Sequence, residues 1–208
     1  MKPAVPFLTS SVSRAVAVFG LVAIVAACGG GGGGGSDGAA PSGVADDGGS
    51  PSTPAPTPPA AADMTCGDAA FRATALRLVN EHRVAGASCG SAGSFGAAPA
   101  AAWSDTLTQA AWQHSTDMAA RNYFSHTSPE GGTLGARVTA TGYAWSSVAE
   151  NIAAGQADAS AVVAGWMVSP GHCRNIMTAA LRDIGMACAR NDASTYRRYY
   201  TLVLAAPR

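Results

Sequence analysis

Lysine is nearly missing from this 208-residue chain: Lys2 is the only one, and residues 63–208 contain none. A catalytic lysine that forms a Schiff base is therefore excluded from that region. Charged residues of both signs are also few, at 12% of the chain, and they balance to a formal net charge of zero. Because nucleic-acid-binding proteins carry a basic patch or stripe, the composition argues against a nucleic-acid partner.

Long apolar runs are scarce as well. The longest covers residues 15–27, and its 13 residues are too few to span a bilayer as a helix. With Lys2 and Arg14 in front of it, this run predicts that residues 1–27 are a bacterial export signal. It ends in Val-Ala-Ala-Cys28, which resembles a lipobox and implies cleavage before Cys28 and acylation of its thiol. The alternative is an ordinary export signal followed by an incidental cysteine.

Large apolar side chains are rare between residues 29 and 62. After Cys28, residues 29–62 hold seven consecutive glycines and a tail that contains TPAPTPP. Such a segment cannot offset its ordering entropy, so we expect residues 28–62 to be a disordered stalk. Residues 63–208 then suit one compact domain. An acylated Cys28 would tether this exported domain to a membrane of the cell envelope.

Four cysteines lie in the domain: Cys66, Cys89, Cys173 and Cys188. An even number in an exported chain favours disulfides, and three pairings are possible. We expect Cys66–Cys89 and Cys173–Cys188, because each would close a short loop at one end of the domain. A zinc site of four cysteines is the alternative, although the chain has no C-x2-C pair.

Helix signals come first along the domain and strand signals come last. Apolar residues at helical spacing follow three candidate caps, and residues 133–141 suit a short fourth helix; the caps are Asp68, Ser104 and Asp158. Strands are expected at residues 184–189 and 199–205, with a third around 147–153. Because these elements do not alternate as βαβ units, the pattern predicts an α+β fold with a small antiparallel sheet.

The stretch WMVSPGHCRNIM, residues 166–177, is the most informative segment of the chain. Pro170-Gly171 should break the helix that begins after Asp158, and His172 should lie on the new turn. Loops held by rigid elements carry many functional sites. His172 is therefore expected to line a surface cleft.

Five segments in order resemble a known family: HSTDMA, YFSHTSPEGG, ARVTATGY, AENIAAGQ and WMVSPGHCRNIM. Their order and spacing are similar to the CAP superfamily, the SCP-like extracellular domain of cysteine-rich secretory, antigen 5 and pathogenesis-related proteins. The resemblance runs from about Arg77 to Ala205. It implies an α-β-α sandwich with a three-stranded antiparallel sheet. It also implies a central cleft with two histidines and, in many animal members, two acidic residues.

Transferred onto this sequence, the cleft residues are His126, Glu150 and His172, and the second acid falls on Ser169. Two imidazoles and one carboxylate are ligands that suit a divalent metal such as zinc. With serine at position 169, such a site would be less acidic and would bind metal more weakly. Taken without the family, the three residues have a plainer interpretation, as histidines that bond to nearby backbone and a structural carboxylate.

Other polar residues are expected to be structural. His114 lies on an apolar helix stripe, which predicts a histidine at the edge of the core. Asn80 is expected to connect a helix to a loop through hydrogen bonds. Ser169 and His172, with Glu150 as orienting acid, could make a serine hydrolase site. However, Ser169 lacks the G-x-S-x-G context of such nucleophiles.

Two functions follow from these residues. The first is an envelope-anchored binding module that presents its His/Glu cleft to a lipid, an envelope polymer or a protein. The second is a hydrolase, in which His126 and His172 hold a metal ion and Glu150 acts as ligand or general base.

Overall fold

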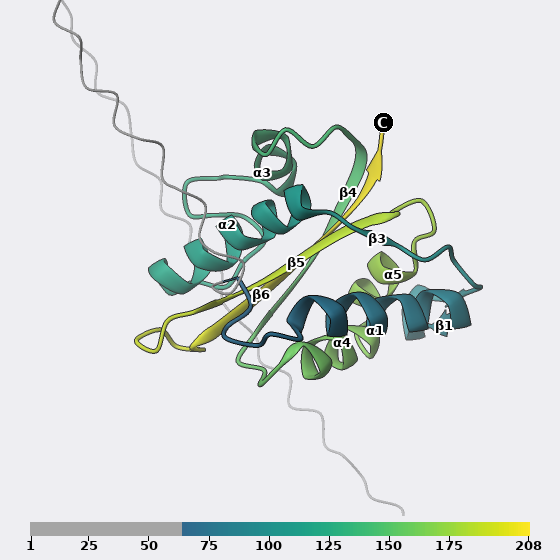
Figure 1. The fold of residues 1–208 in the computed structure, drawn as a ribbon, viewed down its shortest axis with the longest axis horizontal. Coiled ribbons are helices and arrows are strands. Elements are labelled where there is room, and N and C mark those ends of the chain that lie inside the picture. The colour runs from purple at the N-terminus through teal and green to yellow at the C-terminus, as the bar shows by residue number, and fades with distance from the viewer. Residues whose placement is uncertain (1–63) are drawn as a thin grey trace, which may run out of the picture. The chain divides into compact units, whose positions relative to one another are not determined.

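The computed structural model describes residues 64–208, so the predicted export signal, the acylated Cys28 and the stalk lie outside the described residues. Residues 64–208 form the expected α-β-α sandwich (Figure 1). Its helices are α1 (Phe71–Ala85), α2 (Asp105–Arg121), α3 (Leu134–Ala140), α4 (Ala159–Met167) and α5 (Pro170–Met177). Within this part of the chain, none of the helices is long and apolar enough to cross a membrane.

The central sheet contains three long strands, as predicted, and one short addition. β4 (Trp145–Ala154) and β5 (Asp183–Arg190) each pair antiparallel with β6 (Arg198–Pro207). The two-residue β3 (Ala102–Trp103) adds a parallel edge to β5, which the sequence did not predict. Two residues are too few for a periodic signal. The side chain of Asn80 positions β3, because it donates to the Ala101 carbonyl at 3.0 Å and accepts from the Ala101 N–H at 2.7 Å.

The loop between α1 and β3 contains a small hairpin of its own. β1 (Ala87–Ser88) pairs antiparallel with β2 (Ser94–Phe95), and a single 3-10 turn (Gly90–Ala92) joins them. Ser88 lies in the pentapeptide GASCG, which matches G-x-S-x-G. Because Ser88 lies in this hairpin rather than at a strand-to-helix turn, the match does not form a nucleophile elbow.

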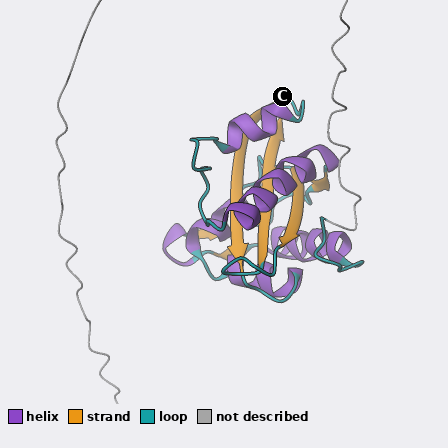
Figure 2. Cartoon of the chain, turned by 90° about the vertical axis from the view of Figure 1, so that its left-hand side faces the viewer, coloured by secondary structure: helices purple, strands orange, loops and turns teal. Residues whose placement is uncertain are grey.

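Strand alternation divides the core between the two faces of the sheet. On β6, Leu202 and Leu204 pack with residues of α1, α4 and α5, whereas Val203 and Ala205 pack with α2 and α3. Figure 2 shows the strands running side by side with helices across them. Successive strand residues point to opposite faces, so one strand can serve two separate apolar layers. The same alternation sets the face of the sheet to which Glu150 points.

Three of the predicted helix starts are confirmed and one is wrong. The Ser104 side chain accepts from Leu107 N–H at 3.2 Å, and Asp158 accepts from Ala161 N–H at 2.9 Å. Thr133 caps α3 in the same way. Asp68, in contrast, lies before the helix: its carboxylate accepts from Ala70 N–H in the preceding turn, and α1 begins at Phe71.

The expectation that His172 sits on a turn is also wrong. α4 ends at Met167, and Pro170 is the first residue of α5, so His172 lies in the first turn of a new helix. Proline suits this position because its missing N–H would have no partner there in any case and its φ is already helical. Pro170-Gly171 therefore separates two helices instead of ending one in a loop.

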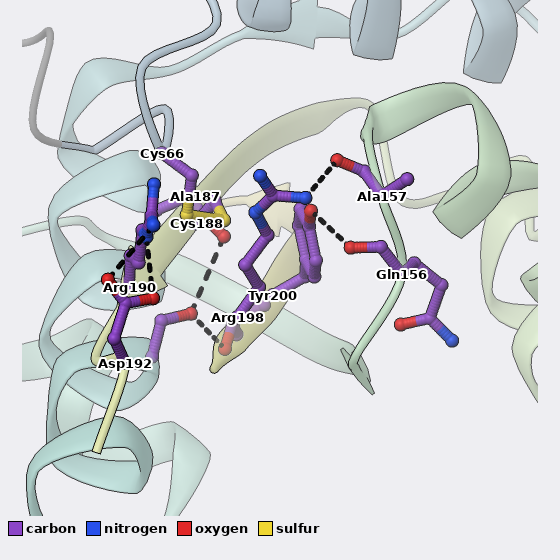
Figure 3. Close-up of a disulfide and its surroundings, with 11 residues drawn as sticks. Cys66, Gln156, Ala157, Ala187, Cys188, Arg190, Asp192, Arg198 and Tyr200 are labelled. Atoms are coloured by element: carbon purple, nitrogen blue, oxygen red, sulfur yellow. Dashed lines mark hydrogen bonds and ion pairs between the residues drawn. A yellow bond between two sulfur atoms is a disulfide. The ribbon is translucent and has the colours of Figure 1, made fainter. Parts of the chain in front are cut away.

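The predicted disulfide pairing must be corrected. Cys66 is bonded to Cys188 and Cys89 to Cys173, each with a Cα–Cα distance of 5.4 Å, in place of Cys66–Cys89 and Cys173–Cys188. Figure 3 shows the first bond, which joins the short segment before α1 to β5. That segment runs beside β5 through a bridge between Thr65 and Cys188. Loop-closure entropy rises only slowly with loop length, so short loops are a weak guide to pairing.

Candidate ligand-binding site

Glu150, on β4, is the centre of a buried polar cluster. Its side chain is only 3% exposed, and both carboxylate oxygens have partners. His126 Nδ1 lies 2.8 Å from Oε1, and Arg137 donates to Oε2 at 2.7 Å. A buried carboxylate is tolerated only where paired and hydrogen-bonded, and this geometry meets that condition.

Arg137 also holds the loop that carries His126. It projects from α3 and donates to the carbonyls of Gly132 and His126, at 3.1 Å each. The Thr133 cap sets where α3 begins and therefore where Arg137 stands. One guanidinium thus bonds to Glu150 and to the backbone of the His126 loop.

His114, on α2, lies close to Glu150 and is 1% exposed. Its Nε2 is 2.9 Å from the carbonyl of Ser125, an acceptor, so Nε2 must carry the proton. The same atom lies 3.8 Å from Glu150 Oε1. The sequence placed His114 at the edge of the core, whereas it is fully buried and interacts with the carboxylate.

The cluster sets the charge state of the site. Burial alone raises the pKa of Glu150, but the hydrogen bond with His126 and the charges of His114 and Arg137 outweigh it, so that pKa is lowered. Burial lowers the pKa of His114; Glu150 opposes this shift and Arg137 adds to it. Burial also lowers the pKa of His172, and the charge of His126 lowers it further. Near neutral pH, Glu150 is therefore ionised and His114 and His172 are neutral.

Asn151, the next residue on β4, faces the other side of the sheet. Its amide donates to the carbonyl of His172 at 3.1 Å and accepts from Asn175 at 2.9 Å. Asn175 also donates to the carbonyl of Glu150, at 3.3 Å. These bonds fasten α5 to the edge strand β4. Glu150 and Asn151 thus support the two histidines from opposite faces, Glu150 holding His126 and Asn151 holding His172.

His172 and Ser169 line a groove of about 320 Å³ beside β4. Its larger walls are Phe124, Ile152, Trp166 and Tyr196. The indole of Trp166 is fixed by a 3.1 Å hydrogen bond to the Ile152 carbonyl, and its ring centroid lies 6.5 Å from that of His172. Phe124 and Tyr196 are 45% and 46% exposed, with ring centroids 5.9 Å apart. Two aromatic rings thus stand open to solvent at the groove.

The four residues inferred for the cleft form two pairs. His126 and Glu150 are in direct contact, while His172 and Ser169 belong to the groove. The two pairs are linked by the electrostatic effect of His126 on His172.

These residues do not fit the expected zinc site. Among residues 64–208 there is no group of three or more His, Cys, Asp or Glu side chains that could hold a metal ion. Glu150 already bonds to His126 through one oxygen and to Arg137 through the other, and both partners would compete with a metal ion for this carboxylate. The guanidinium of Arg137 would also repel a cation at this position.

Sequence reasoning missed Arg137, Asn151 and Asn175. Arg137 and Asn151 stand inside the motifs ARVTATGY and AENIAAGQ, but neither residue type signals a partner that lies far along the chain. For His114 a signal existed, because a histidine on the buried stripe of a helix needs a hydrogen-bond partner. The partner that it finds, the Ser125 carbonyl, is eleven residues away.

A match to a known protein family covers most of the domain. The model of the Cysteine-rich secretory protein family (CAP) matches residues 76–204, more than half of the chain. This chain belongs to the CAP family. The match includes α2 to β5 and most of β6, and therefore every residue of the Glu150 cluster and of the groove.

Individual relatives of this CAP protein match over shorter stretches. In Bacillus subtilis (strain 168), the Uncharacterized protein YkwD is 38% identical over 82 residues, which are 39% of this chain and 32% of that protein. The Uncharacterized membrane protein YlbC of the same organism is 32% identical over 99 residues, 48% of this chain and 27% of that protein. The chain thus spans about a third or less of the length of these curated relatives.

Two solved structures each match about half of this chain. An extracellular protein containing a SCP domain from Bacillus anthracis str. Ames is 34% identical and has a TM-score of 0.45, covering 52% of this chain and 34% of its own. An outer surface protein from Borrelia burgdorferi is 18% identical with a TM-score of 0.48, covering 53% of this chain and 80% of its own.

Proposed function

We propose that this CAP protein is an exported binding module, tethered at the cell envelope through Cys28, whose groove beside His172 takes up a lipid-like amphiphile. The exposed aromatic pair at the groove carries this proposal. Phe124 and Tyr196 are each nearly half exposed although both are large and apolar. Concave sites with apolar walls, a few polar groups and volumes near 300 Å³ are typical for small ligands. Ser169 and His172 supply the polar groups.

Catalysis is supported less well. A hydrolase would need Glu150 as a metal ligand or a general base. Both carboxylate oxygens are engaged, and the lowered pKa of Glu150 makes it a weak base near neutral pH. A polymer as ligand is separated from an amphiphile by the binding test with octyl glucoside.

Removal of the exposed phenyl ring should weaken binding of a neutral amphiphile. The full chain is titrated with octyl glucoside, below the concentration at which it forms micelles, by calorimetry. Phe124→Ala should lower the affinity by about fivefold to tenfold, because truncation of an aromatic contact typically costs at least about 1 kcal/mol.

Val84→Ala is the matched control. Val84 is 57% exposed but lies on α1 outside the groove, so its loss should leave the affinity unchanged. An affinity for octyl glucoside that does not depend on Phe124 would contradict the proposal. Binding of an envelope polysaccharide, but of no octyl probe, would favour a polymer ligand instead.

The anchor can be tested separately. In a bacterial host that processes lipoproteins, the wild-type chain should appear in the membrane fraction, and its mature N-terminal peptide should carry acyl mass on Cys28. Cys28→Ser should move the protein to the soluble extracytoplasmic fraction, because a stable anchor needs the acyl chains. The two disulfides support export, since such bonds persist in oxidising compartments. A mature N-terminus without acyl groups would refute the anchor.

A further inference from the structure

A second pocket, rich in arginine, adjoins the groove. It has a volume of about 200 Å³ and lies at the turn between β5 and β6, lined by Gly155, Arg190, Asp192, Tyr196, Arg197 and Arg198. Tyr196 lines both the groove and this arginine pocket. A ligand that lies along the ring of Tyr196 would therefore reach both. Figure 3 shows Arg190 paired with Asp192, and the guanidinium of Arg198 turned toward Ala157.

Positive charge exceeds negative charge in the arginine pocket. Asp192 accepts two hydrogen bonds of 2.9 Å from Arg190, which neutralise one guanidinium. Arg198 donates to the Ala157 carbonyl at 2.8 Å, and a carbonyl leaves its charge uncompensated. The exposed guanidinium of Arg197 has no hydrogen-bond or ion-pair partner in the described part of the chain. Among the residues that line the pocket, three arginines face one aspartate, which is an excess of two positive charges beyond the Arg190–Asp192 pair, those of Arg197 and Arg198.

The backbone at Arg197 is held in an unfavourable conformation. Its φ is 63°, and the N–H of Arg198 bonds to the Tyr196 carbonyl at 2.7 Å across it. A three-residue turn with positive φ at its centre is rare and strained for a residue other than glycine. Backbone strain of this kind clusters at functional sites. Here the strained position carries an arginine whose guanidinium lacks a hydrogen-bond partner among the described residues.

We propose that the arginine pocket binds the phosphate group of an amphiphile whose alkyl chain lies in the adjoining groove. This inference rests on the proposed function and adds the class of headgroup. A phosphate monoester carries about −1.5 to −2 charges near pH 7, which matches the excess of two positive charges among the residues that line the pocket. Arginine also suits it chemically, because the planar guanidinium donates two parallel hydrogen bonds to phosphate oxygens.

The experiment compares three probes on the full chain in phosphate-free buffer: octyl phosphate, octyl glucoside and inorganic phosphate. Octyl phosphate should bind at least about tenfold more tightly than octyl glucoside, and only its affinity should fall as salt is added. Arg197→Gln should weaken octyl phosphate about fivefold to tenfold and leave octyl glucoside unchanged. Arg182→Gln is the matched control, because this exposed arginine lies just before the opposite end of β5.

Arg197→Gly separates loss of charge from loss of folding. Glycine adopts positive φ without strain, so this variant should melt at a higher temperature than the wild type and still bind octyl phosphate more weakly. Equal affinity of the wild type for octyl phosphate and octyl glucoside would overturn the inference. So would an octyl phosphate affinity that is indifferent to Arg197→Gln, or inorganic phosphate binding as tightly as octyl phosphate.

The two proposals fail in different ways. Phe124→Ala could weaken binding of octyl glucoside while the arginine variants leave binding of octyl phosphate unchanged. That result would support the groove and refute the phosphate site. If neither octyl probe depends on Phe124, the groove itself is wrong, and the inference built on it falls as well.

Discussion

Replacing Gly185 with alanine should destabilise the CAP domain by about 4 kcal/mol or more, a large part of the total stability of an ordinary domain. Gly185 lies on β5 where α2 crosses the sheet. A Cβ there would overlap backbone atoms of Thr108 and Leu107 and lie 2.8 Å from the Leu107 Cβ. Relief would require α2 to move away from the sheet, and α2 carries His114. Urea unfolding followed by circular dichroism measures the loss.

Gly171→Ala is the matched control for this substitution. Gly171 lies in α5, and a Cβ there would meet no atom within 4 Å apart from its own helix backbone and its neighbours in the chain. Alanine is the better helix former by up to about 1 kcal/mol, so this variant should be as stable as the wild type or more stable. Equal stability of Gly185→Ala and Gly171→Ala would show that α2 does not approach β5 as closely as described.

Breaking the Glu150 ion pair should have the second largest effect. Glu150→Leu leaves the guanidinium of Arg137, whose side chain is only 12% exposed, without its carboxylate. Removal of one partner from a buried pair costs about 3–5 kcal/mol, because the remaining charge stays desolvated. The double variant Glu150→Leu with Arg137→Leu should recover much of this loss, since no charge is left unpaired.

The exposed pair of Arg77 and Glu81 provides the control. Both side chains are more than half exposed, so Glu81→Leu should change stability by only about 0.5 kcal/mol. A loss for Glu150→Leu as small as that for Glu81→Leu would mean that the buried pair contributes little to the fold.

The pH dependence of stability provides a second test of the role of Glu150. The folded state lowers the pKa of Glu150 below its ordinary value of 4.5, so its stabilisation is fully present above pH 4.5 and is lost as the pH falls through the lowered value. His114 and His172 also have lowered pKa values, and their contribution is fully present above 6.5 and declines below it. The wild type should lose stability from about pH 6.5 downward. Glu150→Leu should lose less than the wild type below about pH 4.5.

Local features of this protein could be predicted from the chain because they depend on neighbours in the sequence. Ser104 and Asp158 cap the helices that follow them, since a cap needs only an N–H two or three residues away. The strands at 183–190 and 198–207 follow from runs of β-branched, aromatic and small apolar residues. The five ordered motifs predicted the CAP fold that the family match and the structure confirm.

Pairings between distant residues could not be predicted in the same way. The contact between Glu150 and Arg137 joins β4 to α3, and Cys66 finds Cys188 across 122 residues. Neither partner carries a local signal, because other arginines and cysteines of the domain would serve equally well on chemistry alone. The family resemblance placed His126 and Glu150 but omitted Arg137, whose charge is what makes the expected metal site a poor fit.

By itself, the sequence therefore determined the family, the order of helices and strands and the residue types available to the site. The tertiary structure decided which of those residues meet. Period-two alternation along β4 sends Glu150 to one face and Asn151 to the other, and packing of α3 and α5 against that strand selects their partners. Side-chain partners at this edge depend on how distant elements pack, and that packing is a property of the whole fold.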